Sequence, residues 1–254
     1  MTQINLYLTP QQADELALRE KTVVMIDVLR SSTTIVTALA NGARQVIPAT
    51  SVESAVKISG NLFGDVFLLG GERNGKMIQG FTLGNSPLEY TAERVRGKSI
   101  IFSSSNGTQA LARGRHARTL LVGGFVNVSA VAAALQQAGG DVTILCAGNE
   151  GLIALEDAVC AGMLMHRIAG WSADTPGLPD GASVALSLYR AYGKSPLKML
   201  QASEHGRHLV SLGFGDDLRV CAGVDSLPVV PSFEGGVLKP LPAPPQTAAP
   251  SGSL

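Results

Sequence analysis

The sequence predicts an α/β protein in which helices cover both faces of a mainly parallel or mixed sheet, giving three layers (α/β/α). Five short apolar runs each end in a polar or glycine-rich turn, and most continue into a helical pattern: VVMIDVLRSSTT, VFLLGGERNG, SIIFSSSNGT, TLLVGGFVNVS and VTILCAGNEG. Continuous Val/Ile/Leu runs are typical of strands buried on both faces. Because ligands of such sheets bind beyond the carboxyl ends of the strands, we expect the five turns to meet in one crevice.

The first part of the chain alternates predicted strands and helices. Residues 3–9 and 22–28 are predicted strands, and Thr9 with Pro10 predicts the start of a helix that extends to about Arg19.

A further helix follows the second strand. Ser32 or Thr33 is its predicted N-cap, and Gly42 closes it. The strand at residues 44–50 comes next, and its last residue, Thr50, forms a capping box with Glu53 at the start of another helix.

A long glycine-containing loop, GERNGKMIQGFTLGNS, follows the strand predicted at residues 65–70. Loops of this length are usually functional or disordered. Ser86, Pro87 and Glu89 predict a capping box at the start of the next helix. Three strand and helix pairs follow, then helices from 171 to 215, and short closing strands at LRVCAGV and PVVPSFEGGVLKPL.

The length of 254 residues predicts one large domain over residues 1–238, or two intimate subdomains divided near residue 170. The Pro-rich segment 239–254 is expected to be a disordered tail. Twenty basic residues balance twenty acidic ones, which disfavours nucleic acid and anionic membranes as partners and favours a small-molecule substrate. A homodimer remains open.

Three cysteines without a C-x-x-C motif disfavour a disulfide framework and a structural zinc site, and they fit a reducing cytoplasm. The start of the sequence lacks the features of a signal peptide, and no apolar stretch of about 18 residues is present. We therefore expect a cytoplasmic protein.

The turn after the second strand combines groups that suit an anion and a metal. Asp27 ends the strand, and Arg30, Ser31, Ser32 and Thr33 begin the following helix. An arginine can bind two phosphate oxygens together, and a helix start favours an anion. The alternative is that a side chain here only caps the helix. The second carboxylate of the aspartyl phosphatase pattern D-x-D is absent.

The segment GGERNGKM nearly matches the P-loop pattern in its glycines and lysine. Met77 stands where that pattern needs a hydroxyl residue, which disfavours nucleotide binding. A tight turn after a strand explains the glycines but not the adjacent Glu72 and Arg73, so both become candidate site residues.

The other turns supply hydroxyl, amide and glycine groups. Candidates for substrate binding are Asn106, Gly107 and Thr108 in SSSNGT, Asn127 in GGFVNVS, and Asn149 in CAGNEG. Asn and Ser are also common helix N-caps, so capping is the alternative for each of these turns.

Carboxylates at three of the predicted sites suit Mg²⁺, which binds one or two carboxylates together with substrate oxygens. Asp27 and Glu72 are the leading candidates, and Asp157, at the start of a helix, is the third. His205 and His208 are three residues apart, but without a third nitrogen ligand they are interpreted as residues of a surface helix.

The order of these sequence blocks and the residues within them resemble those of the 2-phosphosulfolactate phosphatase family. The blocks are DVLRSSTTIVTALANGA, GGERNGKMIQGFTLGNSPLEY, FSSSNGTQAL, GGFVNVSAVAAAL, CAGNEG with LEDAVCAG, and CAGVDSLPVVPSF, which together cover most of residues 20–235. The resemblance implies an α/β/α fold and Mg²⁺-dependent hydrolysis of (R)-2-phospho-3-sulfolactate to sulfolactate and phosphate, a step in coenzyme M biosynthesis. One departure is Ser-Ser-Ser-Asn-Gly-Thr where Thr-Thr-Asn-Gly-Thr is expected, and it retains the hydroxyls.

Two other functions stay open. The chain could be a phosphatase of another small phosphorylated acid, since a fold and family constrain chemistry better than substrate. It could also be a non-catalytic binder of anionic metabolites, although such a binder does not need the carboxylates of Asp27, Glu72 and Asp157. The role of Asp27 is open between metal ligand, which we favour, and nucleophile.

Overall fold

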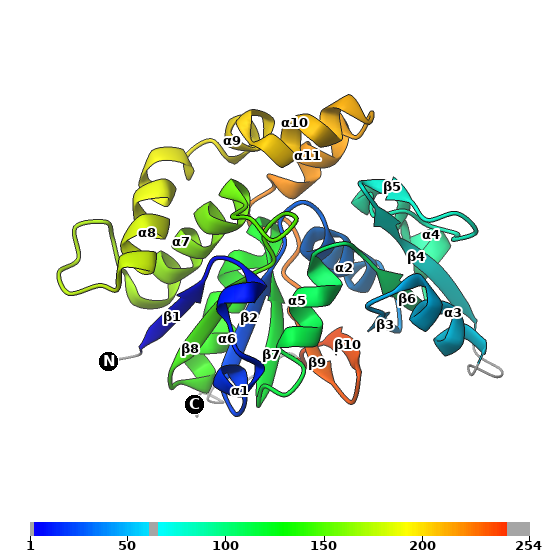
Figure 1. Cartoon of the computed structure of the whole chain (residues 1–254), viewed down its shortest axis with the longest axis horizontal. Coiled ribbons are helices and arrows are strands. Elements are labelled where there is room, and N and C mark those ends of the chain that lie inside the picture. Colours follow the sequence, from blue (N-terminus) through cyan, green and yellow to red (C-terminus); the bar gives the residue numbers. More distant parts are fainter. Residues whose placement is uncertain (1–2, 61–65, 243–254) are drawn as a thin grey trace, which may run out of the picture.

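The computed structural model describes residues 3–60 and 66–242, and these residues contain a ten-stranded mixed sheet with helices on both faces (Figure 1). The predicted α/β/α class is confirmed. All five apolar runs form strands of this sheet: β2 (Thr22–Ile26), β4 (Phe67–Arg73), β6 (Ser99–Ser103), β7 (Thr119–Gly123) and β8 (Val142–Cys146). The remaining strands are β1 (Ile4–Tyr7), β3 (Gln45–Pro48), β5 (Lys76–Met77), β9 (Pro231–Glu234) and β10 (Val237–Pro240).

The sheet consists of two parallel groups joined by a hairpin. Its strand order is β1-β8-β2-β7-β9-β10-β3-β6-β4-β5. The first four strands are parallel to one another, and so are β3, β6 and β4. Strands β9 and β10 pair antiparallel with each other and with their outer neighbours, so the second parallel group runs opposite to the first along the sheet.

The helices form two outer layers and a cap. Helices α6 and α7 contact β7, β8 and β2 on one face, whereas α2 and α5 contact β7 and β2 on the other. Helices α9, α10 and α11 lie beyond the sheet, with α9 beside α8 and the far end of α10 nearest the β4–β5 hairpin in the view of Figure 1. The α-helices are α1 (Glu15–Leu18), α2 (Ser31–Ala40), α3 (Val52–Gly60), α4 (Ala92–Val95), α5 (Gly107–Arg113), α6 (Val128–Ala138), α7 (Leu155–Ala169), α8 (Asp180–Tyr192), α9 (Pro196–Ala202), α10 (Glu204–Ser211) and α11 (Gly215–Cys221). Three 3₁₀ helices complete the described elements: η1 (Pro10–Gln12), η2 (Pro87–Glu89) and η3 (Phe125–Asn127).

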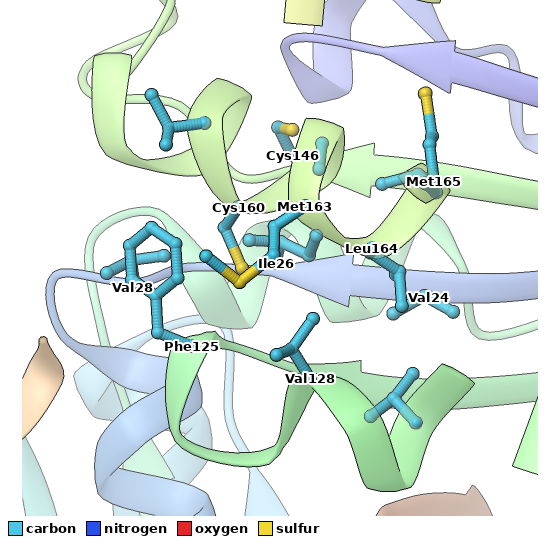
Figure 2. Close-up of a cluster of buried hydrophobic side chains, with 14 of the residues drawn as sticks. Val24, Ile26, Val28, Phe125, Val128, Cys146, Cys160, Met163, Leu164 and Met165 are labelled. Carbon is cyan, nitrogen blue, oxygen red and sulfur yellow. The ribbon is translucent and has the colours of Figure 1, made fainter. Parts of the chain in front are cut away.

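Alternate residues of β2 face the two cores. Val24 and Ile26 belong to the core formed with α6 and α7 (Figure 2), and Val23 and Met25 belong to the core formed with α2 and α5. Every residue of β2 is buried, as expected for a strand with parallel neighbours and helices on both faces.

The segment after residue 170 contributes to the first of these cores. Leu186 of α8, Leu200 of α9, Leu209 of α10 and Leu218 of α11 are buried in the same cluster as Val24 and Ile26. The cap helices and the first parallel group are therefore joined by one continuous apolar cluster.

Several predicted helix starts are wrong in position. Thr9 makes no side-chain cap and begins only the short η1, while Asp14 caps α1 by accepting from Leu16 N. The N-cap of α2 is Arg30, not Ser32 or Thr33. In these cases the tertiary contacts of the turn override the local capping preference.

Three later expectations also need correction. Ser86 opens only η2 and makes no side-chain cap, because its hydroxyl donates to Asp217 instead. LRVCAGV belongs mainly to helix α11 rather than to a strand. The predicted disordered tail starts too early, since Lys239 and Pro240 are part of β10; its residues 243–254 lie outside the described residues. No helix in the described ranges is both long and apolar enough to span a membrane.

Candidate active site

The ends of β2, β4, β6 and β8 surround a cavity of about 240 Å³. Six of the predicted site residues line it: Asp27, Arg30, Ser31, Glu72, Asn106 and Asn149. The two parallel groups run in opposite directions, yet their carboxyl ends meet here, because residues that follow β2, β6 and β8 share the cavity with Glu72 of β4. The predicted crevice is therefore a junction between two groups of strands.

Asp27 lies at the end of β2 with only 4% of its surface exposed. One carboxylate oxygen accepts the backbone N–H of Ser31 at 3.1 Å, and the Asp27 N–H donates to the Ser32 hydroxyl at 2.9 Å. Burial, with help from the charge of Glu72, raises the pKa of Asp27 to about 6, although the hydrogen bonds from Ser31 and the charge of His205 lower it. The carboxylate is thus held in a site that disfavours its charge.

Gly107 lets the start of α5 approach Asp27. A Cβ atom at this position would lie 2.5 Å from Oδ2 of Asp27 and 2.6 Å from Cβ of Ser31. Both distances are shorter than real contacts allow, so the absence of a side chain at Gly107 is required for this arrangement.

Glu72 is fixed by the β4–β5 hairpin and by the loop after β6. Its carboxylate accepts the N–H of Gly75 at 2.9 Å, and the N–H and hydroxyl of Ser105 at 2.7 and 3.2 Å. Asn74 and Gly75 have φ values of 51° and 76°, the left-handed pair that a type I′ hairpin turn needs. Gly75 of the apparent P-loop pattern therefore serves a β-hairpin, which is the tight-turn alternative, while Gly70 lies within β4.

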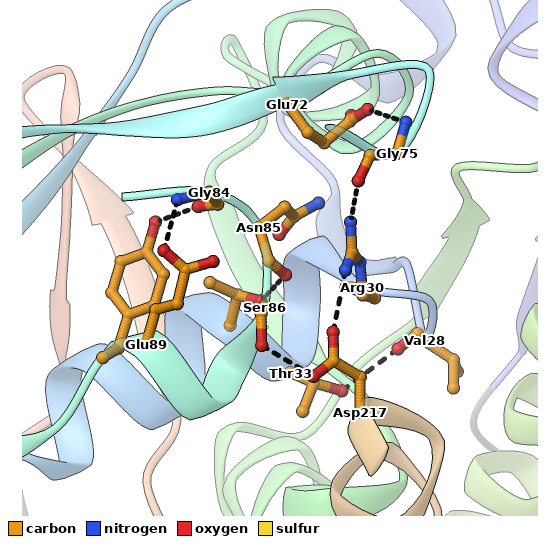
Figure 3. Close-up of polar contacts among 12 residues, drawn as sticks. Val28, Arg30, Thr33, Glu72, Gly75, Gly84, Asn85, Ser86, Glu89 and Asp217 are labelled. Carbon is orange, nitrogen blue, oxygen red and sulfur yellow. Dashed lines mark hydrogen bonds and ion pairs between the residues drawn. The ribbon is translucent and has the colours of Figure 1, made fainter. Parts of the chain in front are cut away.

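Arg30 is buried and already has partners within the protein (Figure 3). Its guanidinium forms a 2.7 Å ion pair with Asp217, donates to the carbonyl of Gly75 at 2.7 Å, and lies 4.3 Å from the ring centre of Phe214. The other carboxylate oxygen of Asp217 accepts the Ser86 hydroxyl at 2.6 Å. This network fastens the hairpin and α11 to the turn after β2.

Three predicted site residues between positions 30 and 75 do not line the cavity: Ser32, Thr33 and Arg73. Thr33 donates its hydroxyl to the Val28 carbonyl at 3.1 Å. Arg73 donates to the Glu72 carbonyl and to the Ser103 hydroxyl. Ser32, which accepts from Asp27, likewise supports the turn from behind.

Two further candidates, Thr108 and Asn127, stabilise turns beside the cavity or away from it. Thr108 and Ser104 hydrogen-bond each other at the start of α5. Asn127 is buried, accepts from Gly124 N and donates to the carbonyls of Val122 and Val229, which is the capping role left open as its alternative.

Asp157 lies behind the cavity wall. Its two carboxylate oxygens accept the N–H groups of Val28 at 2.8 Å and Gly148 at 3.0 Å. Burial, with the charges of Asp27 and Glu156, raises the pKa of Asp157 well above its ordinary value. These bonds tie the turn after β2 to the turn after β8, and Asp157 is not among the residues that line the cavity.

Helix α10 supplies cavity residues that sequence reasoning missed. Glu204, His205 and His208 all line the cavity; His208 is exposed on α10, as expected for a surface helix, whereas His205 is half-buried, which was not expected. The Nδ1 atom of His205 lies 3.5 Å from the buried carboxylate of Glu156. Their spacing of three residues placed the histidines on one helix face. Only the packing of α10 over the β4–β5 hairpin shows what that face contacts.

The donors around the cavity fit a hard cation. Asp27 and Glu72 contribute carboxylates, Asn106 and Asn149 contribute amides, and the amide oxygen of Asn85 is buried without a hydrogen-bond partner in the described residues. Within residues 3–60 and 66–242, no three His, Cys, Asp or Glu side chains lie close enough together to hold a metal ion by themselves. Mg²⁺ does not require such a cluster, since it keeps waters and binds substrate phosphate.

The fold and this cavity define an α/β protein with a candidate active site of carboxylates and amides at the ends of its strands. A profile of the 2-phosphosulpholactate phosphatase family matches residues 7–236, and the chain belongs to that family. The resemblance found in the sequence is confirmed.

Similar proteins cover nearly the whole chain. A protein of Symbiobacterium thermophilum named "Probable 2-phosphosulfolactate phosphatase" is 44% identical over 228 residues, which is 88% of this chain and 95% of that protein. Proteins with the same name are 39% identical over 233 residues in Caldanaerobacter subterraneus subsp. tengcongensis (92% and 96%) and 40% identical over 241 residues in Synechococcus sp. strain CC9605 (93% and 99%).

Proposed function

We propose that this chain is a Mg²⁺-dependent phosphatase that hydrolyses the phosphate monoester of 2-phospho-3-sulfolactate to 3-sulfolactate and phosphate. Family membership and the names of the relatives support the substrate. The observation that carries the chemistry is the single cavity in which Asp27 and Glu72 lie together at the ends of strands from both parallel groups.

The charge of the cavity supports the need for a cation. Four carboxylates line it: Asp27, Glu72, Glu150 and Glu204. Among the described residues Arg30 is the only lysine or arginine in the lining, and its charge is already paired with Asp217. A substrate with a phosphate, a carboxylate and a sulfonate would be repelled by these carboxylates unless a divalent cation lay between them.

We assign Asp27 and Glu72 as the carboxylates that hold Mg²⁺. The N–H groups of Gly75 and Ser105 orient the carboxylate of Glu72 as outer partners orient metal ligands, and the N–H of Ser31 does so for Asp27. When bound, Mg²⁺ neutralises phosphoryl oxygens and orients the attacking group. Asn106 and Asn149 can donate hydrogen bonds to the substrate, and the donors of Arg30 that are not directed to Asp217 and Gly75 can do so too. The hydroxyl of Ser31 donates to Ser104 at 3.0 Å and would have to turn from it to reach the substrate.

Phosphate release tests this proposal directly. Racemic 2-phospho-3-sulfolactate and a panel of phosphorylated hydroxy acids are incubated with the protein in Mg²⁺, in Mn²⁺, and after exhaustive chelation. We expect Mg²⁺-dependent release with preference for the sulfonated substrate, and loss of release in Asp27→Asn and Glu72→Gln. Asp174→Asn, which alters an exposed ion pair with Arg190, is the matched control and should remain active.

Each other outcome identifies an alternative. Preference for a non-sulfonated acid would change the substrate and retain the chemistry. Full activity in chelated buffer would show that the reaction does not need Mg²⁺. Absence of release with binding retained would favour the anion-binding protein. A phosphorylated Asp27 peptide, trapped by acid quench during turnover, would assign Asp27 as nucleophile instead of metal ligand.

A further inference from the structure

A second charged pair borders the cavity and has no role in the proposed metal site. His205 belongs to α10 and Glu156 to α7, which are far apart in the sequence. Glu156 is only 2% exposed, and its Oε1 atom has no hydrogen-bond partner among the described residues other than the nearby imidazole, whose Nδ1 lies 3.5 Å away. A buried carboxylate in such a position is costly unless a cation faces it.

The pair favours a protonated histidine. Burial disfavours the imidazolium and by itself lowers the pKa of His205, but the hydrogen bond and charge of Glu156, together with the charge of Asp27, outweigh burial and raise that pKa above its ordinary value. Because Nδ1 faces Glu156, the proton on Nε2 is left for another acceptor. Nε2 makes no hydrogen bond to any described residue, and His205 lines the cavity.

We propose that His205 is the general acid that protonates the leaving oxygen of the substrate, and that Glu156 is the residue that positions its imidazole. The inference rests on the proposed phosphatase function and adds a proton donor to it. The leaving group of this substrate is a secondary alkoxide. Such a strongly basic group departs readily only if it receives a proton.

The step balances as follows. The bond between phosphorus and the C2 oxygen breaks, and its electron pair stays on that oxygen, which takes the Nε2 proton of His205. The oxygen of a water molecule forms the new bond to phosphorus, and both water protons remain on the product as dihydrogen phosphate. After the product leaves, neutral His205 takes a proton from solvent and returns to the imidazolium.

Other charged groups also face His205 and enter any pH dependence. Around the same cavity these are Asp27, Arg30, Glu72, Glu150, Glu204 and His208. Arg30 opposes protonation of His205, but its ion pair with Asp217 reduces that effect. Glu156 is the group whose removal should alter His205 most directly.

Leaving-group dependence separates a proton donor from a structural histidine. An aryl phosphate such as p-nitrophenyl phosphate expels a weakly basic phenolate and needs little protonation. We expect His205→Gln to lower kcat on 2-phospho-3-sulfolactate by roughly 10² to 10⁴-fold and on the aryl phosphate by less than about 10-fold. Glu156→Gln should show the same pattern with a smaller loss, and Glu156→Asp should recover part of it. His166→Gln, at the end of α7, is the control.

Two further readouts do not depend on the aryl substrate. The imidazole of His205, titrated by NMR in metal-free protein, should have a pKa above the ordinary 6.5 that falls in Glu156→Gln. The kcat of the wild type should fall as pH rises through the His205 pKa in the enzyme–substrate complex, because the acid is then deprotonated. That basic limb should move to lower pH in Glu156→Gln and disappear in His205→Gln. Circular dichroism of each variant controls for folding.

The outcomes distinguish this inference from the proposed function. Equal losses on both substrates, no loss on either, or a basic limb that persists in His205→Gln would overturn the role of His205 while leaving the phosphatase intact. A histidine pKa unaffected by Glu156→Gln would overturn the positioning role of Glu156. Absence of phosphate release by the wild type from every monoester would overturn the proposed function, and this inference with it.

Discussion

Gly107 shows how closely single residues are fitted around the proposed catalytic carboxylate. We predict that Gly107→Ala displaces Asp27 or Ser31, because the new methyl group would lie within about 2.6 Å of both. Overpacking of this kind typically costs about 1–3 kcal/mol of stability. We expect kcat/KM to fall at least tenfold, roughly 1.4 kcal/mol or more of transition-state stabilisation.

Gly124→Ala provides the matched control for that substitution. Its nearest neighbour, Cβ of Ser32, would lie at an ordinary 3.6 Å from the new methyl group. Similar kinetics in Gly107→Ala and Gly124→Ala would show that Asp27 does not have to be held in this position.

The buried charge of Asp27 should make the metal-free protein less stable as pH rises. The folded-state pKa of about 6 is higher than the ordinary value of 3.8, so the folded protein binds the proton more tightly than the unfolded chain does. The stabilisation is complete below about pH 4 and is lost as pH rises through 6. In chelated buffer, Asp27→Asn should therefore gain stability relative to the wild type between pH 4 and 7, on the order of 3 kcal/mol.

Urea unfolding of both proteins at several pH values measures this difference. A difference in unfolding free energy between wild type and Asp27→Asn that stays constant with pH would contradict the raised pKa. A gain of stability on removing a carboxylate is what a functional site under electrostatic strain predicts.

For single residues, the sequence identified candidate site residues best where they directly follow a predicted strand. Asp27 and Asn149 follow buried apolar runs, and the ends of such strands are where ligands bind. The role of His205 was missed because this residue does not follow a strand, and its meeting with Glu156 depends on where the fold places α10 relative to α7. Asn127 was overestimated, because an Asn that caps a turn and one that binds substrate have the same local sequence.

Among the elements, the β4–β5 hairpin contacts both the carboxylate of Glu72 and the guanidinium of Arg30. Gly75 donates its N–H to Glu72 and offers its carbonyl to Arg30, and a Cβ atom there would lie 2.7 Å from Leu212 next to α10. We predict that Gly75→Ala destabilises the protein and lowers activity, because it combines strain at φ 76° with this contact.

Gly80→Ala isolates the contribution of packing. Gly80 also has a positive φ, 85°, but no atom lies within 4 Å of the position that a methyl group would occupy there, so the substitution adds backbone strain alone. Thermal unfolding and kcat/KM of the two variants give the comparison. We expect Gly75→Ala to lose about 1–3 kcal/mol more stability than Gly80→Ala, and equal losses would contradict the importance of the contact with Leu212.

Element by element, the buried strands were predicted best. A continuous run such as VVMI has the composition of a strand covered on both faces, and β2 is buried throughout. Short elements were predicted worst: the segment containing α11 was expected to be a strand, because a run of seven residues with Leu, Val and Cys fits either structure. Its helical form depends on burying Leu218 and Cys221 in a core made by distant helices.

For the molecule as a whole, the site lies between two groups of strands that the β9–β10 hairpin links within the sheet of the described residues. Asp27 comes from the group of β1, β8, β2 and β7, and Glu72 from the group of β3, β6 and β4. The sequence predicted one sheet, but the opposite direction of its two parallel groups depends on pairings of β9 and β10 that are distant in sequence. A ligand held by both carboxylates would join the two groups.

This arrangement predicts that Mg²⁺ stabilises the whole fold. If the ion binds folded protein alone, a concentration of 100 times its Kd should add about 2.7 kcal/mol to the free energy of unfolding. For a chain of this size the corresponding rise in Tm is roughly 5 to 10 °C. Scanning calorimetry with Mg²⁺ and with an equal ionic strength of NaCl measures the specific effect.

Substitution of each proposed metal ligand tests whether both groups of strands contribute to the stabilisation by Mg²⁺. Asp27→Asn and Glu72→Gln should each remove most of the Mg²⁺-dependent rise in Tm, because each takes away the carboxylate supplied by one group. Asp174→Asn should retain the rise, since its carboxylate is exposed and pairs with Arg190 on the surface. A rise that survives in Asp27→Asn but not in Glu72→Gln would place the ion on the hairpin alone. Survival in both variants would show that the ion binds elsewhere, and the metal assignment would then be wrong.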